Sequence, residues 1–159
     1  MIINTETLLQ LAAEKIGIKV LKFDDDWCCN LEIDQGLFYL SFDTDHRQES
    51  MVISAMLGPL TEISPNDTLK YFMGLNSYQL LAERGIFCLD EATEQLLLVR
   101  QVHAATQNKQ SFSVIMEQFV DDAYTWSKYL QEQPADDVLA TAQAPWVDEK
   151  DQRHAIYLL

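Results

Sequence analysis

Clusters of acidic and histidine side chains are the first residues of this chain whose types could do chemistry. Three consecutive aspartates occupy residues 24–26, and a second group joins Asp43, Asp45 and His46. Clustered carboxylates attract hard cations, so each group could bind a metal. Neither group has the spacing of a calcium loop with its distal glutamate, and aspartate-rich turns between strands are common solvated connections. We therefore interpret both groups as turns and expect no metal site.

The remaining reactive residue types do not form a catalytic pattern either. His103 and His154 have no nucleophile or carboxylate beside them that suggests a dyad. No glycine-rich loop ending in lysine is present to hold a phosphate, which argues against an ATPase. The three cysteines, Cys28, Cys29 and Cys88, form neither an even disulfide set nor a Cys-x-x-Cys pair. We therefore expect neither an enzyme nor a cofactor.

Size and charge limit the kinds of partner. The 159 residues fit one domain, and the 48% apolar content is enough for a core. Lysine and arginine number 11 against 25 acidic residues, so the net charge of −14 should repel nucleic acid and anionic membrane surfaces. No basic region precedes an apolar stretch at the start, and no apolar run approaches the roughly 18 residues of a membrane span. We expect a soluble, cytoplasmic protein without membrane insertion.

The periodicity of the sequence predicts an α+β fold. Asn4 or Thr5 caps a first helix that stops at Gly17, and Ser64 followed by proline starts a second helix. Apolar and polar residues alternate from Trp27 onward, as on half-buried strands with short connections, which indicates an antiparallel meander. The predicted elements are a helix at 5–16, a short strand at 19–23, strands at 27–34, 38–43 and 51–57, a helix at 65–83, hairpin strands at 86–90 and 95–102, and a closing helix at 111–131.

The first two helices carry more apolar surface than a helix covering its own sheet would use. In the first helix the apolar residues spread over more than one stripe, and in the second they occupy two sides. A second copy of the chain is the economical partner for this excess, and we predict the dimer contact at Tyr71, Leu75 and Tyr78. After Pro134 the composition changes, so we divide the chain into a domain at 1–132 and an acidic tail of little fixed structure at 133–159.

Several positions then point to a known family. They are Gly17 after the first helix, Leu31-Glu32-Ile33-Asp34 after the aspartate turn, Leu75-Asn76, Gly85-Ile86-Phe87-Cys88-Leu89-Asp90, Leu96-Leu97-Leu98, and Phe119, Ala123, Trp126 and Leu130 of the last helix. With the low isoelectric point and the small size, residues 5–131 resemble the type III secretion effector chaperones of the Tir-chaperone (CesT-like) family, class I. Two features depart from that pattern: the linker at 102–110 lacks an expected proline-containing segment, and the tail is longer than the family core needs.

The resemblance implies an order α-βββ-α-ββ-α, with helices packed on a twisted antiparallel sheet, in a bacterial homodimer. It implies a partner, the N-terminal chaperone-binding region of a secreted effector, which is kept locally unfolded, soluble and competent for secretion without nucleotide hydrolysis. The secretion ATPase is a further candidate partner. By this analogy the first helix and the meander bind the effector, and the predicted contact residues are Leu8, Leu11, Ile16, Phe23, Leu31, Ile33 and Leu40.

Two alternatives from other classes make different predictions. In one, the same scaffold is a regulatory binding module that sequesters a folded partner through acidic residues 136–151, so that deleting 133–159 abolishes binding. In the other, Asp45 and His46 form the metal site of an enzyme. This predicts that divalent cations raise the thermal stability, and that changing Asp45 and His46 to alanine abolishes the rise. We expect no such stabilisation.

Overall fold

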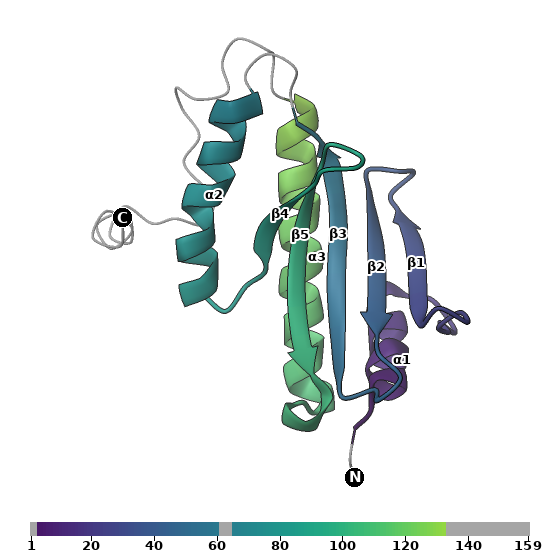
Figure 1. Cartoon of the computed structure of the whole chain (residues 1–159). Helices are drawn as coiled ribbons and strands as arrows, with labels where there is room; N and C mark the ends of the chain where they lie inside the picture. The colour runs from purple at the N-terminus through teal and green to yellow at the C-terminus, as the bar shows by residue number, and fades with distance from the viewer. Residues whose placement is uncertain (1–2, 61–64, 133–159) are drawn as a thin grey trace.

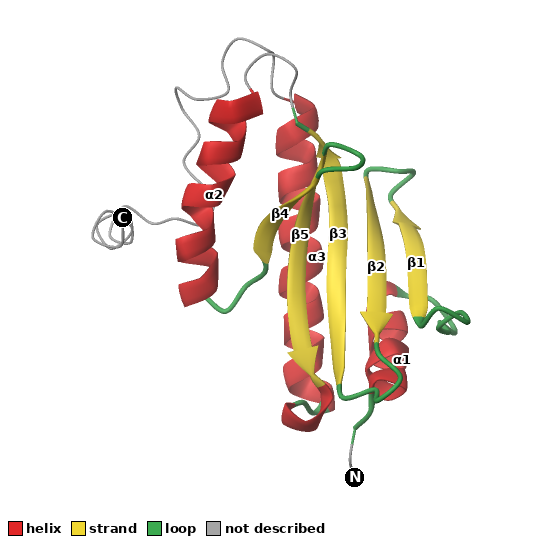
Figure 2. Cartoon of the chain, in the orientation of Figure 1, coloured by secondary structure: helices red, strands yellow, loops and turns green. Residues whose placement is uncertain are grey.

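The computed structural model describes residues 3–60 and 65–132, and its elements follow the predicted order α-βββ-α-ββ-α. Figure 2 shows the helices and strands along the chain. Their bounds are α1 at Thr5–Ile16, β1 at Cys28–Ile33, β2 at Phe38–Thr44, β3 at Ser50–Pro59, α2 at Pro65–Leu81, β4 at Ile86–Asp90, β5 at Gln95–His103, a short 3-10 turn at Ala104–Thr106, and α3 at Lys109–Glu132.

The five strands form one antiparallel sheet in the order β1-β2-β3-β5-β4. Apolar partners lie opposite one another across it, as where Leu31 pairs with Leu40 and Leu40 with Ala55. Helices α1 and α3 lie behind the sheet on one face, and α2 stands beside β4 (Figure 1). The order leaves β1 at one edge with β2 as its single neighbour in the sheet.

The ends of α1 confirm the predicted caps. The side-chain oxygen of Asn4 accepts a hydrogen bond from the Thr7 N–H at 2.9 Å, and Gly17 adopts a left-handed φ of 85° that L side chains rarely adopt. The stripe formed by Leu8, Leu9, Ala12 and Ala13 is fully covered within the protomer. The expected excess of apolar surface on α1 is therefore largely absent, because the sheet covers one side of the helix and α3 covers another.

Two ion pairs hold α1 against α3. The Lys15 ammonium lies 3.1 Å from the Glu117 carboxylate, and Lys109 lies 2.8 Å from Glu14. These exposed pairs each contribute less than about 1 kcal/mol. They mark the side of α1 that faces α3.

Helix α2 covers the outer edge of β4. The side chain of Asn76 accepts a hydrogen bond from the Phe87 N–H at 2.6 Å and donates one to the Phe87 carbonyl at 2.9 Å. An edge strand otherwise presents unpaired backbone groups that can pair with another chain. The side chain of Asn76 thus takes the place of a further strand next to Phe87.

A cluster of aromatic rings joins α2, β4 and α3. Phe72 and Trp126 are fully buried with ring centroids 5.2 Å apart, and Phe87 lies 4.9 Å from Phe72. Tyr71 stacks beside Tyr129 at 6.4 Å. Burial, with a smaller contribution from Tyr129, raises the pKa of Tyr71 to about 12 from 10.0.

The raised pKa of Tyr71 predicts a loss of stability at alkaline pH. Above about pH 10 the unfolded chain releases this proton while the folded chain keeps it, so the free energy of unfolding falls until about pH 12, by up to about 2 kcal/mol. Tyr71→Phe should remove most of that slope in urea titrations between pH 9 and pH 12. An unchanged slope in the variant would contradict this assignment.

One predicted strand is wrong. Residues 19–23 form no strand, although Leu21 is buried as its apolar character suggested. The Leu21 carbonyl accepts a hydrogen bond from the side-chain amide of Gln10 on α1. This side chain therefore supplies the hydrogen bond that a neighbouring strand would supply in a sheet. The N-cap at Ser64 lies outside the described residues.

Candidate functional site

Two of the predicted effector-contact residues belong to the core. Leu8 and Leu40 are 0% exposed, Leu8 on the covered side of α1 and Leu40 in the centre of β2. As folded, neither side chain can reach a partner, and we correct the predicted surface accordingly. Alternation in a strand shows which residues share a face, but it does not show that α1 and α3 cover that face.

Four other predicted contact residues are partly buried at the margins of the core. Leu11 and Ile16 lie on α1, and Leu31 and Ile33 lie two positions apart on one face of β1. Leu11 precedes Glu14 and Lys15 by about one turn, so it lies on the side of α1 that faces α3. Contact of these four residues with a partner stays a prediction.

Of the predicted contact residues, Phe23 lines one of the grooves found in the described part of the chain. This α1 groove, of about 760 Å³, runs between α1 and the segment 21–27. Its lining residues are Asn4, Glu6, Thr7, Leu9, Gln10, Leu21, Lys22, Phe23, Asp24, Asp25 and Trp27. The apolar floor combines Leu9 and Leu21, which are 1% and 6% exposed, with the partly buried Phe23.

A hydrogen-bonded turn positions Trp27 in this groove. The Asp24 carboxylate accepts hydrogen bonds from the N–H groups of Asp26 and Cys28 at 3.0 and 2.9 Å, and the Asp24 N–H donates to the Cys28 carbonyl at 2.8 Å. Trp27 itself has a left-handed φ of 60° and is 37% exposed. The aspartate turn, predicted as a solvated connection, therefore also presents an aromatic side chain that the sequence analysis did not assign to the site. A tryptophan that directly follows three aspartates was the available signal.

The second acidic group also forms a turn. The Asp45 carboxylate accepts hydrogen bonds from the N–H groups of Arg47 and Gln48, both at 3.0 Å. Asp43 accepts a hydrogen bond from the Cys28 thiol at 3.0 Å, and burial, followed by this bond, raises the pKa of that thiol. Among residues 3–60 and 65–132, no three histidine, cysteine or acidic side chains come together as a metal site.

The predicted dimer residues, Tyr71, Leu75 and Tyr78, are each partly buried in the protomer. Tyr71 belongs to the aromatic cluster, and Leu75 packs against the core. The apolar side chains that α2 exposes are instead Met73 at 54%, Leu80 at 71% and Leu81 at 65%. These three residues lie on a different side of α2 from Tyr71, Leu75 and Tyr78, whose contact with a second copy stays a prediction.

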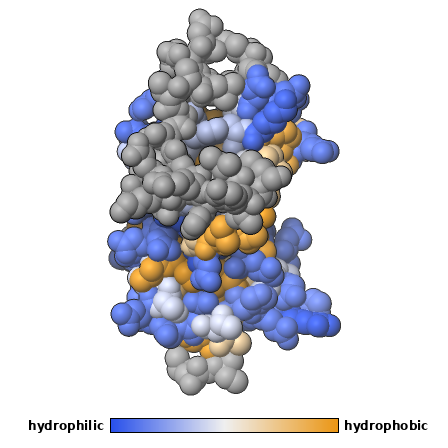
Figure 3. Space-filling view, turned by 90° about the vertical axis from the view of Figure 1, so that its left-hand side faces the viewer, coloured by the Kyte–Doolittle hydropathy of each residue, from blue (hydrophilic) through white to orange (hydrophobic). Residues whose placement is uncertain are grey.

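Leu80 belongs to an apolar patch on the α2 side of the molecule. With Ile86, which is 41% exposed, it lines a shallow groove of about 470 Å³ beside β5. Figure 3 shows apolar side chains gathered at mid-height on this side of the molecule. We call Leu80, Leu81 and Ile86 the α2 patch.

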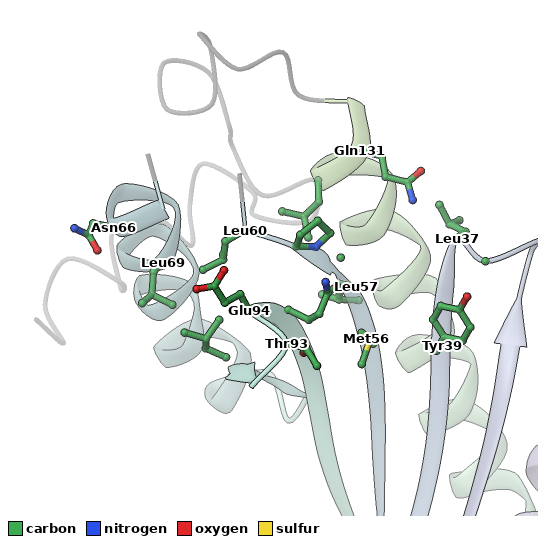
Figure 4. A pocket seen from close by; sticks show the side chains of 16 residues that line it. Leu37, Tyr39, Met56, Leu57, Leu60, Asn66, Leu69, Thr93, Glu94 and Gln131 are labelled. Atoms are coloured by element: carbon green, nitrogen blue, oxygen red, sulfur yellow. The ribbon is translucent and has the colours of Figure 1, made fainter. Parts of the chain in front are cut away.

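A third groove, the end groove, lies where β3, β4 and α3 end. Its volume is about 750 Å³, and Tyr39 of β2 and Leu69 of α2 lie on opposite sides of it (Figure 4). Gly58 adopts a φ of 143° at the register shift of β3, which lets the strand bend along this groove. Glu94 is the charged side chain that lines it.

Comparison with known proteins decides the family. The profile of the Tir chaperone protein (CesT) family matches residues 7–127. This chain belongs to the Tir chaperone protein (CesT) family. It is 33% identical over 97 residues to the Tir chaperone of Escherichia coli and 32% identical to that of Citrobacter freundii. These matches cover 60% of this chain and 59% of each relative, so the chain aligns with less than two thirds of their length.

Solved structures share the fold of this family member. The ExsC–ExsE complex matches with a TM-score of 0.66 and 20% identity, covering 79% of this chain and 92% of that chain. The HopA1–SchA chaperone–effector complex matches with a TM-score of 0.61 and 21% identity, over 78% and 93% of the two chains. At these identities the likeness establishes the shared α-βββ-α-ββ-α fold. Within the part of the chain that the structure describes, no helix is long and apolar enough to cross a membrane.

Proposed function

We propose that this CesT family protein is a cytoplasmic, non-enzymatic chaperone that binds the N-terminal region of a type III secretion effector. It keeps that region locally unfolded and soluble without nucleotide hydrolysis, and it delivers the effector to the secretion apparatus, with the secretion ATPase as a further partner. The observation that carries the proposal is the α1 groove, whose lining residue Trp27 immediately precedes the edge strand β1. A related structure by fold, the HopA1–SchA complex, is described as a chaperone–effector complex.

The groove and the edge strand suit an extended client. A segment without stable structure can add to the backbone of an edge strand while its apolar side chains enter neighbouring pockets. Trp27 of the α1 groove immediately precedes β1, and the backbone groups of Cys28 are already bonded to Asp24. One extended segment could therefore use the groove and the edge of β1 beyond Cys28. Burial of its apolar residues then offsets the entropy that the segment loses, and no nucleotide is needed.

Capture of the client from its native cytoplasm tests this function. The protein that copurifies should be a secreted protein, held through its N-terminal region at two chaperone chains per client, as mass spectrometry and native mass measurement would show. A folded enzyme or regulator as the main client would favour the regulatory alternative. In that case deleting residues 133–159, which lie outside the described residues, should abolish the capture.

We further propose that the protein is a homodimer, with the α2 patch at the contact. The three side chains of this patch lie on neighbouring elements and are 41–71% exposed. The packing of α2 on β4 within the protomer leaves this apolar surface uncovered. A two-fold contact uses the same patch of both protomers, so it buries two copies of each exposed residue.

Substitution of the α2 patch should separate the protomers. Leu80→Asp with Leu81→Asp should shift the dimer to a monomer, raising its dissociation constant by about 100-fold or more because two charges per chain enter an apolar contact. Light scattering across a dilution series measures this. The control is Val114→Asp, which places a charge at an apolar α3 residue that is 48% exposed. Equal dimer stability in all three proteins would exclude the α2 patch.

A further inference from the structure

The charge of the α1 groove differs from that of the other two grooves. Its charged lining residues are Glu6, Asp24, Asp25 and Lys22, three acids against one base. The end groove has one glutamate, and the groove beside β5 has two arginines and one glutamate. A concave surface lined by one sign of charge concentrates ligands of the opposite sign. Of these three grooves, the α1 groove therefore most favours a cationic ligand.

Trp27 adds a second preference of the same kind. Its side chain is 37% exposed, and within residues 3–60 and 65–132 its ring stacks on no other aromatic ring and lies under no cation. Lysine and arginine are attracted to the face of a tryptophan ring, and nearby carboxylates attract the same cation. Asp25 lines the same groove two residues before Trp27.

The apolar floor of the groove favours a ligand that carries apolar groups in addition to the cation. Leu9 and Leu21 are buried below it, and Phe23 contributes a partly exposed ring. A simple cation would leave this floor uncovered. A peptide segment can supply both groups, and Trp27 of the groove immediately precedes the edge strand β1, which suits an extended backbone.

We propose that the α1 groove selects client segments in which apolar residues alternate with lysine or arginine, the apolar side chains on Leu9, Leu21 and Phe23 and a cation between Trp27 and the carboxylates of Glu6 and Asp25. This inference rests on the proposed chaperone function and names the chemistry of its client. The acidic surface thus contributes to recognition as well as to solubility. Because the attraction is electrostatic, it weakens as salt is added.

Two labelled peptides test the proposal on the full chain by fluorescence anisotropy. One peptide alternates leucine with arginine, and the other alternates leucine with glutamate. The arginine peptide should bind about tenfold tighter or better at low salt, and the difference should shrink at 0.5 M salt. Glu6→Lys with Asp25→Lys should reverse the preference. Trp27→Leu should weaken the arginine peptide several-fold more than it weakens a peptide that alternates leucine with serine.

The control variant is Glu91→Lys, which makes the same change of charge at an exposed acid outside the three grooves and should keep the preference. Thermal unfolding is measured for every variant, and a melting temperature close to that of the unchanged chain shows that the variant folds. Equal binding of the charged peptides, or a preference that Glu6→Lys with Asp25→Lys leaves intact, would overturn the proposed selectivity while the chaperone function stands. Failure of all three peptides and of the native client to bind would overturn the chaperone function itself.

Discussion

Replacing Trp27 with aspartate should weaken the binding of the native client by about 100-fold, because a tryptophan that becomes buried on binding contributes about 2–3 kcal/mol to an interface. The stability of the chain itself should change little. Trp27 is 37% exposed, and its left-handed φ of 60° suits aspartate better than it suits tryptophan. Isothermal titration with the N-terminal region of the client gives the affinity, and chemical denaturation gives the free energy of unfolding.

Tyr124→Asp is the matched control for this experiment. Tyr124 is an exposed aromatic residue of α3, at 40%, that lines none of the three grooves. The control should bind the client like the unchanged chain. If both substitutions weaken binding equally, or if neither does, the α1 groove is not the contact.

Replacing Asp122 with alanine should lower the free energy of unfolding by about 3 kcal/mol or more. Asp122 is 3% exposed, and its carboxylate binds the Arg84 guanidinium through two hydrogen bonds at 2.5 and 2.7 Å. Burial raises the pKa of this carboxyl, although Arg84 acts in the opposite direction. The pair therefore adds little net stability, but its rupture leaves a partly buried guanidinium without this carboxylate. Thermal and urea unfolding measure the loss.

The double variant Arg84→Met with Asp122→Leu separates the charge from the packing. It should unfold within about 1 kcal/mol of the original protein, since apolar residues of similar size can replace a buried ion pair at little cost. If the double variant is as unstable as Asp122→Ala alone, methionine and leucine cannot replace the packing between α3 and residue 84, and the cost is not that of an unpaired charge.

The sequence predicted the order of elements well where local chemistry determines them. Asn4 and Gly17 fix the ends of α1, and the spacing of Phe119, Ala123 and Trp126 fixes the buried stripe of α3. The strand predicted at residues 19–23 was wrong because a single distant side chain, that of Gln10, satisfies the Leu21 carbonyl. Such a contact leaves no periodic signal.

The candidate site was predicted less well, because burial depends on how elements pack. Leu8 and Leu40 are as apolar as any contact residue, yet α1, α3 and the sheet enclose them. Phe23 lines the α1 groove, and its contact with a client stays a prediction. The exposure of Trp27 follows from the turn that Asp24 organises, which the sequence pattern does not reveal. The sequence predicted two apolar sides on α2. In the structure Tyr71 packs into the aromatic cluster, whereas Leu80 is exposed.

Hydrogen–deuterium exchange on the chain, with and without the N-terminal region of its copurified client, tests the central claim most directly. We expect slower exchange on binding in α1, in residues 21–27 and in β1, and no change in the α2 patch. The bound client region itself should lack the slow-exchanging core of a folded domain. Protection confined to α2 and β4, or a client that stays fully folded in the complex, would contradict the account.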